Sequence, residues 1–241
     1  MPDARLIRIL TRLAADDGTA GGATRLCVVC AEVTEMTGAG IMLLADGQPQ
    51  GSICTTDDVS ALIEDLQYTL GEGPCVDAYR KHTPVAEPDL AEPEVVRWSA
   101  FASPAVGAGA RAIFGFPVAV GDVRIGALNL YRDAPGPLTA EQHADALVVA
   151  AVAARAIMTM QGSARRGQLG ADLEASGNFR YVVHQAAGMV AVQMGVPVDD
   201  ALVQLRAHAF GNDRALTDVA KDVVERRVRF DRSDPESGPE A

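Results

Sequence analysis

Apolar residues at the start of the chain recur with the period of a helix. Leu6, Leu10 and Leu13 lie on one side of a predicted amphipathic helix over residues 4–16. A glycine-rich loop follows, and a second helix is predicted over residues 23–37. The chain therefore opens with two predicted helices.

Two pairs of apolar runs further along the chain predict β-hairpins. The pairs are residues 40–45 with 50–55 and residues 111–120 with 123–131. Asp46-Gly47 separates the first pair and Gly121-Asp122 the second, and such residues between apolar runs favour a tight turn. We therefore expect four antiparallel strands.

Helical patterns lie between and after the hairpins. Helices are predicted over residues 57–70, from Pro74 onward, over 94–107 and over 138–160, with a short strand over 83–86. In the first of these helices the residues expected to face inward are Val59, Leu62, Ile63 and Leu66. The order of helices, hairpin, helices, hairpin and helix predicts an α+β fold with an antiparallel sheet.

Residues 178–230 contain three short apolar stripes, each with helical spacing. Gly195 ends the first helix, Gly211-Asn212 ends the second, and Asn212 or Asp213 is expected to cap the third. The stripes are Phe179, Val183, Ala186, Val190 and Met194; Val198, Leu202, Leu205 and Ala209; and Leu216, Val219 or Ala220, Val223 and Arg227. None of these helices can bury its stripe alone, so we expect an all-α three-helix bundle.

The predicted helix over residues 138–160 is rich in alanine and has two apolar faces. The faces are formed by Leu147, Ala151, Ala154 and Met158 and by Val148, Val152 and Ile157. The first face has the spacing of helices that pack closely on a partner, although it could also cover its own sheet. Because there are two faces, we expect one to cover the sheet and the other to form a homodimer.

Charge is distributed unevenly along the 241 residues. The formal net charge is -11, and a protein surface that is acidic overall repels the phosphates of nucleic acids. Residues 1–164 carry 11 Lys and Arg against 20 Asp and Glu, whereas residues 178–230 carry 7 against 6. A surface that binds anions is therefore expected only in the C-terminal bundle.

The apolar segments predict a cytoplasmic protein with no membrane partner. The N-terminal residues have no apolar core of a signal peptide, and the longest apolar run, residues 146–154, is much shorter than the roughly 20 residues that cross a bilayer. In the cytoplasm, Cys27, Cys30, Cys54 and Cys75 are expected to be reduced thiols rather than a disulfide framework.

For the Cys27 and Cys30 pair, and separately for Cys75, a chemical function has to be weighed against simple packing. The spacing of Cys27 and Cys30 fits a redox pair or half of a metal site, but no further ligands complete a set, which favours two small residues buried in a core helix. Cys75 lies in the first turn of the helix that begins at Pro74, where the pKa of a thiol can be lowered. Packing under the loop is the favoured alternative, because Glu72 and Asp77 oppose a thiolate.

The sequence has no pattern of a catalytic or cofactor site. There is no P-loop, no pair of zinc-binding histidines on a helix and no nucleophile elbow. The histidines are scattered through the chain at His82, His143, His184 and His208. We therefore expect no enzyme activity, no cofactor and no metal.

Several motifs in residues 1–162 resemble the GAF domains that precede ANTAR domains in actinobacteria. They are Leu70-Gly71-Glu72-Gly73-Pro74-Cys75, Pro84-Val85, Asp89-Leu90, Arg97-Trp98 with Phe101, Phe116-Pro117 and Gly126-Ala127-Leu128-Asn129-Leu130-Tyr131. The resemblance implies an antiparallel sheet covered by helices, with a pocket for a small ligand in some relatives. We expect Cys75, Trp98 and Phe101 near such a pocket, although Trp98 could instead fill the core. The pattern of cyclic-nucleotide-binding relatives is not visible.

Residues 178–230 resemble the ANTAR domain, a bacterial three-helix module that binds paired RNA hairpins and prevents transcription termination. The resemblance lies in Gln185-Ala186-Ala187-Gly188-Met189, in Ala201 with Leu205-Arg206, and in Asn212 with Leu216 and Val219-Ala220. The family usually has lysine where this chain has Ala187. The implied organisation is a GAF sensor domain over residues 1–162, a linker over 163–177, an ANTAR domain over 178–230 and a disordered tail over 231–241.

The resemblance implies a signal-responsive regulator that binds tandem RNA hairpins as a homodimer, with an unidentified small molecule as a possible GAF ligand. Cations and planar side chains suit phosphates and unpaired bases. The candidates for RNA contact are Arg180, His184, Gln185, Arg206, His208, Asn212, Arg214 and Lys221. Two alternatives remain open, namely a protein-interaction module without RNA binding, which the alanine at position 187 would allow, and a thiol redox sensor that acts through Cys75.

Overall fold

The computed structural model describes residues 2–15, 22–45, 47–163, 178–212, 214 and 216–230. The chain divides into two compact units, Met1–Leu173 and Glu174–Ala241. The predicted linker and tail fall almost entirely outside the described residues. Each unit is described by itself.

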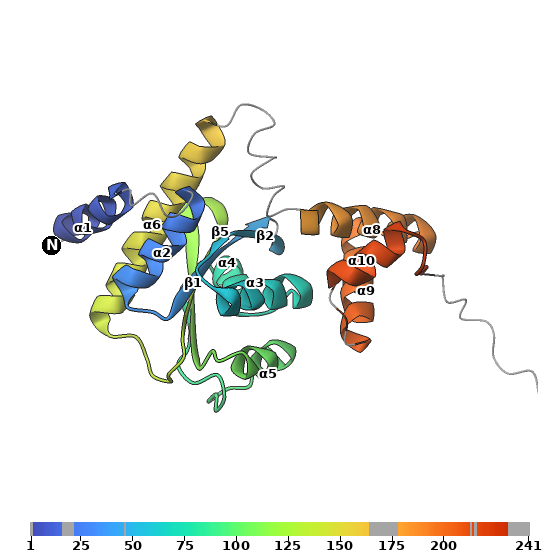
Figure 1. Ribbon diagram of the computed structural model, residues 1–241, viewed down its shortest axis with the longest axis horizontal. Coiled ribbons are helices and arrows are strands. Elements are labelled where there is room, and N and C mark those ends of the chain that lie inside the picture. Colours follow the sequence, from blue (N-terminus) through green and yellow to red (C-terminus); the bar gives the residue numbers. More distant parts are fainter. Residues whose placement is uncertain are drawn as a thin grey trace, which may run out of the picture. The chain divides into compact units, whose positions relative to one another are not determined.

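The first unit is built on a five-stranded antiparallel sheet (Figure 1). Its strands are β1 (Gly38–Ala45), β2 (Gln48–Thr55), β3 (Val85–Glu87), β4 (Ala112–Val120) and β5 (Val123–Arg132), in the order β2-β1-β5-β4-β3. The pairs β1–β2 and β4–β5 are antiparallel hairpins, as their turn sequences predict. The α+β fold with an antiparallel sheet is therefore confirmed.

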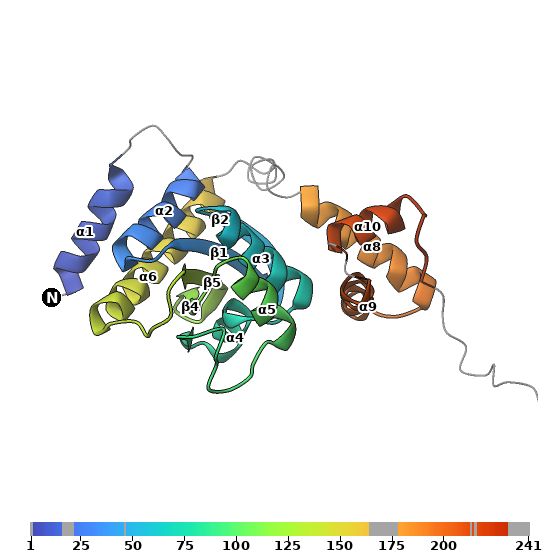
Figure 2. The same ribbon diagram turned by 60° about the horizontal axis from the view of Figure 1, so that its bottom comes forward.

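Helices cover both faces of this sheet (Figures 1 and 2). On one side lie α1 (Pro2–Ala14), α2 (Gly22–Thr34) and α6 (Ala140–Ser163), and on the other lie α3 (Asp58–Leu70), α4 (Pro74–Lys81) and α5 (Ser99–Gly107). The alternation of side chains along β4 sends Phe114 into the core under α2 and α6 and Ile113 into the core under α3 and α5. The sheet therefore separates two apolar layers.

Helix α1 buries the predicted face only in part. Leu6 and Leu13 pack against the core as predicted, whereas Leu10 is 48 % exposed and Ile9 is fully buried instead. The shift has a polar cause, because Arg5 and Arg8 both bind Asp145 on α6. Burial of Asp145 in turn requires such charged partners, and they fix the face that α1 presents.

Helix α3 begins with a capping box. The Asp57 carboxylate accepts a hydrogen bond from the Ser60 backbone N–H at 2.7 Å, and the Ser60 hydroxyl accepts one from the Asp57 N–H at 3.0 Å. The predicted inner face is wrong in part, because Leu62 is 39 % exposed while Glu64 and Gln67 are buried. The side of α3 that faces the sheet therefore carries the polar side chains of Glu64 and Gln67, whereas Leu62 points toward solvent.

Helix α5 is shorter than predicted. It starts at Ser99, and the expected helical residues 94–98 form no helix. Trp98 precedes it in the left-handed region with φ of 55°, which interrupts a right-handed helix. The apolar pattern around Val95 misled the prediction, since Val95 is 65 % exposed.

Helix α6 has the two apolar faces that its sequence indicates. Val152 and Ile157 are buried in the core, whereas Leu147 and Met158 are 45 % and 44 % exposed. Ala154 was expected on the outer face but is fully buried. The exposed face is therefore narrower than predicted.

The second unit contains three helices that pack against one another, α8 (Asn178–Met194), α9 (Val198–Gly211) and α10 (Leu216–Val224). Its buried residues follow the predicted stripes: Val183, Ala186, Val190, Leu202, Leu205, Ala209, Leu216, Val219, Ala220 and Val223. Val198 and Arg227 are exceptions, because Val198 is 49 % exposed and Arg227 lies beyond the end of α10. Asn212 caps the end of α9 rather than the start of α10, since its side-chain amide donates to the His208 carbonyl at 2.7 Å.

Candidate functional site

A layer of polar side chains is buried between the sheet and helix α3. Glu64, Gln67 and Asn129 are each at most 3 % exposed. Asn129 lies on β5, paired with Gly40 of β1 on one side and with Gly115 of β4 on the other. The missing side chain of Gly40 makes room for the carboxyl group of Glu64, since a Cβ atom at residue 40 would lie 2.9 Å from its Oε1.

Asn129 is unusual within this layer. Neither its amide oxygen nor its amide nitrogen has a hydrogen-bond partner among the described residues. A buried amide without partners is costly, and such groups often mark a place where a ligand or water supplies the missing bonds. The buried polar layer is therefore the candidate sensing site of the first unit.

Cys75 lies beside this layer, in the first turn of a helix as the sequence predicts. It lies in the first turn of α4, after Gly73 and Pro74, and its backbone N–H donates to Gln67 Oε1 at 2.8 Å. Its thiol is fully buried, and burial followed by the nearby Glu64 carboxylate raises the pKa of Cys75 well above its usual value. The packing alternative is therefore favoured over a reactive thiolate.

Trp98 and Phe101 were expected beside a ligand pocket and are found in the apolar core under α5. Trp98 is 7 % exposed and Phe101 is fully buried, with their rings edge to face at 6.2 Å between centroids. Arg97 stacks over the Trp98 ring at 4.5 Å. The two aromatic residues are together, whereas Cys75 lies with Gln67 and Glu64.

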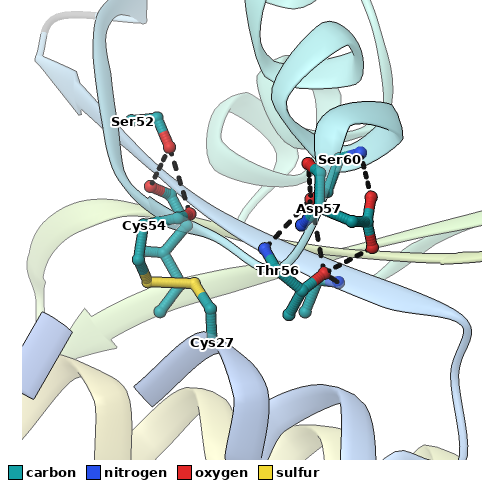
Figure 3. The surroundings of a disulfide bond; sticks show 8 residues. Cys27, Ser52, Cys54, Thr56, Asp57 and Ser60 are labelled. Carbon is teal, nitrogen blue, oxygen red and sulfur yellow. Dashed lines mark hydrogen bonds between the residues drawn. A yellow bond between two sulfur atoms is a disulfide. The ribbon is translucent and has the colours of Figure 1, made fainter. Parts of the chain in front are cut away.

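Cys27 and Cys54 form a disulfide, which contradicts the prediction of four reduced thiols (Figure 3). The bond connects helix α2 to strand β2 across a Cα–Cα distance of 6.0 Å. Local spacing drew attention to Cys27 and Cys30, but only packing of α2 on β2 brings Cys27 to Cys54. Cys30 and Cys75 are free and buried, and burial raises the pKa of Cys30 to about 12.

The disulfide is close in sequence to the cap of α3, and Figure 3 shows both. Thr56 lies two residues after Cys54, and its hydroxyl donates to the Asp57 carboxylate at 2.8 Å. The Tyr131 hydroxyl donates to the same group at 3.1 Å. Burial would raise the pKa of Asp57, but these bonds and that from the Ser60 N–H together lower it. Burial and the negative charge of Asp57 raise the pKa of Tyr131.

The predicted RNA contacts of the second unit are not all on its surface. His184 and Gln185 are exposed on α8, and Asn212 is exposed at the end of α9. Arg206 is only 8 % exposed, which contradicts its assignment to the exposed side. Its position on the inner face of α9, next to Leu205, explains the difference. The side chain of Arg180 lies outside the described residues.

The other predicted contacts already have partners within the unit. Arg214 binds Asp222 at 2.6 Å, and Lys221 lies 3.6 Å from Asp218. His208 packs edge to face on the ring of Phe230, with 5.1 Å between centroids. Side chains with such partners are less available for an RNA phosphate.

Ala187 was noted because the ANTAR family, which this segment resembles in sequence, usually has lysine at this position. Its side chain is fully buried. A lysine at this position would therefore have to carry its ammonium group out of the core along its flexible stem. The alanine of this chain leaves the neighbouring surface without that cation.

An open groove of ≈ 640 Å³ lies on the second unit. Helix α8 forms one side and the segment after α10 forms the other. The residues that line the groove are Gln185, Gly188, Met189, Val192, Gln193, Arg226 and Arg229. Of the predicted contacts, only Gln185 is among them.

Sequence analysis missed Arg226 and Arg229. The apolar stripe of the third helix seemed to continue to Arg227, so this segment was assigned to a helix, whereas α10 ends at Val224. Clustering of three arginines in the last residues of the unit was the available signal. The lining of the groove combines two cations and two amides with Met189 and Val192, a combination that suits an anionic ligand with flat rings.

In the described part of the chain, no group of three or more His, Cys, Asp or Glu side chains could hold a metal ion. Helix α6 is long and apolar enough over Ala140–Met160 to cross a membrane by length and composition. The core helix of a soluble protein has the same properties, and the buried face of α6 lies in the core. Helices α8 and α9 meet that test only together, with a bend of 104° between them.

Residues 25–158 match the model of the GAF domain family, and no curated protein matches the sequence.

Among solved structures, the GAF domain of an Acinetobacter phosphoenolpyruvate-protein phosphotransferase is similar, with 13 % identity and a TM-score of 0.49 over 67 % of this chain and 96 % of that chain. The GAF domain of the corresponding Coxiella burnetii protein has 14 % identity and a TM-score of 0.47 over 66 % and 96 %. A domain of a sensor histidine kinase protein from Sinorhizobium meliloti has 18 % identity and a TM-score of 0.46 over 58 % and 90 %. Because the family match spans more than half of the residues and agrees with the sheet and its helical layers, the chain belongs to the GAF domain family, the sensor domains of signalling proteins.

Proposed function

We propose that the chain is a cytoplasmic, signal-responsive RNA-binding regulator that promotes transcription antitermination. The GAF domain senses a signal, and the C-terminal three-helix unit acts as an ANTAR domain that binds paired RNA hairpins. The protein acts by binding rather than by catalysis and needs no cofactor.

The observation that carries this proposal is the exposed groove of the second unit. It combines Arg226 and Arg229 with the Gln185 and Gln193 amides beside Val192. Unpaired RNA loops offer phosphates to cations, base edges to amides and base faces to apolar surfaces. The sequence motifs of α8 and α9 point to the same class of ligand.

The signal enters at the buried polar layer of the GAF domain. Asn129 has unused hydrogen-bonding groups there, and Gln67 connects the layer to the start of α4 through its bond to Cys75. A small polar molecule that bonds to Asn129 would stabilise one arrangement of α3 and α4 over another. The chemical identity of that molecule is left open by the proposal.

The regulator acts as a homodimer through the outer face of α6. Leu147 and Met158 are large apolar residues exposed on this helix. Two copies present two RNA-binding modules, which matches an RNA with two hairpins. Linking two weak contacts raises the effective concentration for the second, so modest affinity per module is sufficient.

The proposal is tested by measuring the affinity of the full chain for an RNA of two neighbouring hairpins across a salt series. We expect the dissociation constant to rise with salt, since each phosphate contact releases counterions. A single-hairpin RNA of the same loop sequence is the matched control and should bind at least tenfold more weakly. Absence of salt-sensitive binding to a pool of tandem hairpins with randomised loops would refute RNA binding.

A second candidate function is a protein-interaction module without RNA binding. It is favoured by the exposed apolar side chains of the second unit, where Val192 is 84 %, Val203 53 % and Phe210 60 % exposed. Val203 and Phe210 lie on α9 and do not line the groove. If the unit binds RNA, replacement of both residues by serine should leave the RNA affinity unchanged. The alternative would be favoured if the protein binds no RNA and the double replacement abolishes binding of a protein partner.

A further inference from the structure

The end of the third helix in the second unit is held in an unusual backbone conformation. Helix α10 ends at Val224, and two residues later Arg226 has φ of 62° in the left-handed region. The Arg226 N–H donates to the Val223 carbonyl at 3.0 Å, and the Arg227 N–H donates to the Asp222 carbonyl at 2.7 Å. Glycine is the usual residue at such a position, because a side chain is strained there. The chain places an arginine where glycine would be less strained.

The cations around this position divide into two groups. Arg227 binds the Asp222 carboxylate at 2.6 Å and also Glu225, and Arg214 binds Asp222 as well. Arg226 and Arg229 have no ion pair among the described residues, and both are exposed along the groove. Carboxylates of the same unit therefore neutralise Arg214 and Arg227, whereas Arg226 and Arg229 keep their charge available for a ligand.

The segment after α10 is held against helix α8, which forms the opposite side of the groove. The Phe230 N–H donates to Gln193 Oε1 at 2.9 Å, and this bond ties the segment with Arg229 to helix α8. The amide NH₂ of Gln193 remains a donor. Gly188 also lines the groove and leaves open space there, since an added Cβ atom would meet nothing within 4 Å.

We propose that Arg226 and Arg229 hold consecutive phosphates of a single-stranded RNA loop, whose base lies on Val192 and Met189 and is contacted at its edge by the amides of Gln185 and Gln193. Guanidinium groups bind phosphate oxygens in a forked geometry that lysine cannot match. Val192 is 84 % exposed, and a base ring would cover it. This inference rests on the proposed RNA-binding function and names the residues that carry it.

The strained position of Arg226 provides a variant that separates binding from folding. Arg226→Gly removes the charge and at the same time relaxes the backbone, so the protein should melt at the same or a higher temperature. Arg229→Gln removes the second charge without a backbone effect. Arg227→Gln is the matched control, because it removes one charge from the neighbouring residue whose guanidinium is already paired.

The experiment measures binding of full-length protein and each variant to a tandem-hairpin RNA with randomised loops, at several salt concentrations. We expect Arg226→Gly and Arg229→Gln each to weaken binding roughly threefold to tenfold at ~0.1 M salt and to reduce the salt slope by about one. The control Arg227→Gln should keep the slope of the unmodified protein. Melting curves are recorded on the same samples.

Each outcome decides one of the claims. The assignment to Arg226 and Arg229 is overturned if all three variants bind RNA as tightly as the unmodified protein. It is also overturned if Arg227→Gln loses as much RNA affinity as the other two variants. In both cases RNA binding itself stands. If the unmodified protein itself shows no binding, the proposed function fails and this inference fails with it.

Discussion

Asp57 shows how one side chain connects several parts of the GAF domain. Its carboxylate caps α3 through Ser60 and also accepts hydrogen bonds from Thr56 and Tyr131. The last of these partners lies on β5, so the cap also joins the helix to the centre of the sheet. Loss of this one carboxylate affects a helix end and a strand together.

We predict that Asp57→Ala lowers the free energy of unfolding by about 1 to 2 kcal/mol, the usual effect of losing a helix cap. The pKa of Asp57 is lowered in the fold. Its contribution is therefore fully present above the unfolded value near pH ~4 and disappears as the pH falls through the lower, folded value. Urea unfolding at pH 7 and at pH 3 measures both effects.

The exposed neighbour provides the control for this prediction. Asp58→Asn removes a carboxylate from the same first turn but not from the cap, and it should cost only a few tenths of a kcal/mol. Equal losses for the two variants, or an Asp57→Ala effect that persists unchanged at pH 3, would contradict the account.

Cys75 provides a second prediction for a single residue. Because burial and Glu64 raise the pKa of its thiol, mild peroxide should leave Cys75 unmodified in the folded protein. Mass spectrometry of the peptides after treatment measures this directly. Oxidation of Cys75 faster than that of a fully exposed model thiol would restore the redox-sensor alternative.

Sequence reasoning placed individual residues well where local chemistry decides their position. Pro74 and the glycines before it placed Cys75 correctly in the first turn of α4. It failed where tertiary packing decides the position of a side chain. The stripe of α1 did not show that Arg5 and Arg8 would turn toward Asp145. The local sequence likewise did not show that Arg206 faces inward. The groove arginines were missed for the same reason, since the groove exists only once α8 and the segment after α10 are packed.

At the scale of secondary-structure elements, the disulfide connects α2 to the edge strand β2. Both hairpins were predicted correctly because turn sequences are local signals, whereas the pairing of Cys27 with Cys54 depends on which strand lies under α2. The start of α5 was also missed, because the left-handed Trp98 is not visible in the apolar pattern. A disulfide is rare in the reducing cytoplasm that we propose for this protein.

We predict that the purified, unfolded protein reacts with a thiol-alkylating reagent at two cysteines without reductant and at four after reduction. Reduction should lower the free energy of unfolding by about 3 to 4 kcal/mol for a loop of this length. Cys54→Ser should show the same loss without reductant. Four reactive thiols before reduction would contradict the disulfide. Alkylation in freshly broken cells shows whether Cys27 and Cys54 are oxidised or reduced in the compartment where the protein is found.

The whole molecule carries a charge of -11, and its acidic residues are not confined to the GAF domain. Residues 231–241, which lie outside the described part of the chain, contain four acidic residues against one arginine and directly follow the groove segment in sequence. Because these residues follow Arg226 and Arg229 within a few positions of the sequence, their negative charge should oppose an RNA phosphate.

We predict that removing residues 231–241 strengthens binding of tandem-hairpin RNA about twofold to fivefold at low salt. The gain should shrink as salt rises, because exposed charges are screened over about 10 Å at 0.1 M. A neutral tail of the same length made of glycine and serine is the control and should behave like the truncation. Weaker binding after removal would show that the tail contributes contacts rather than repulsion.

The central claim is that the C-terminal unit selects RNA with paired hairpins. Sequencing of the RNA that co-purifies with the crosslinked full-length protein from cells tests this most directly, with a chain lacking residues 178–241 as the control. We expect transcripts with two neighbouring hairpins to be enriched over the control, at sites upstream of terminators. Equal recovery of RNA by both proteins, with no hairpin feature in common, would contradict the account.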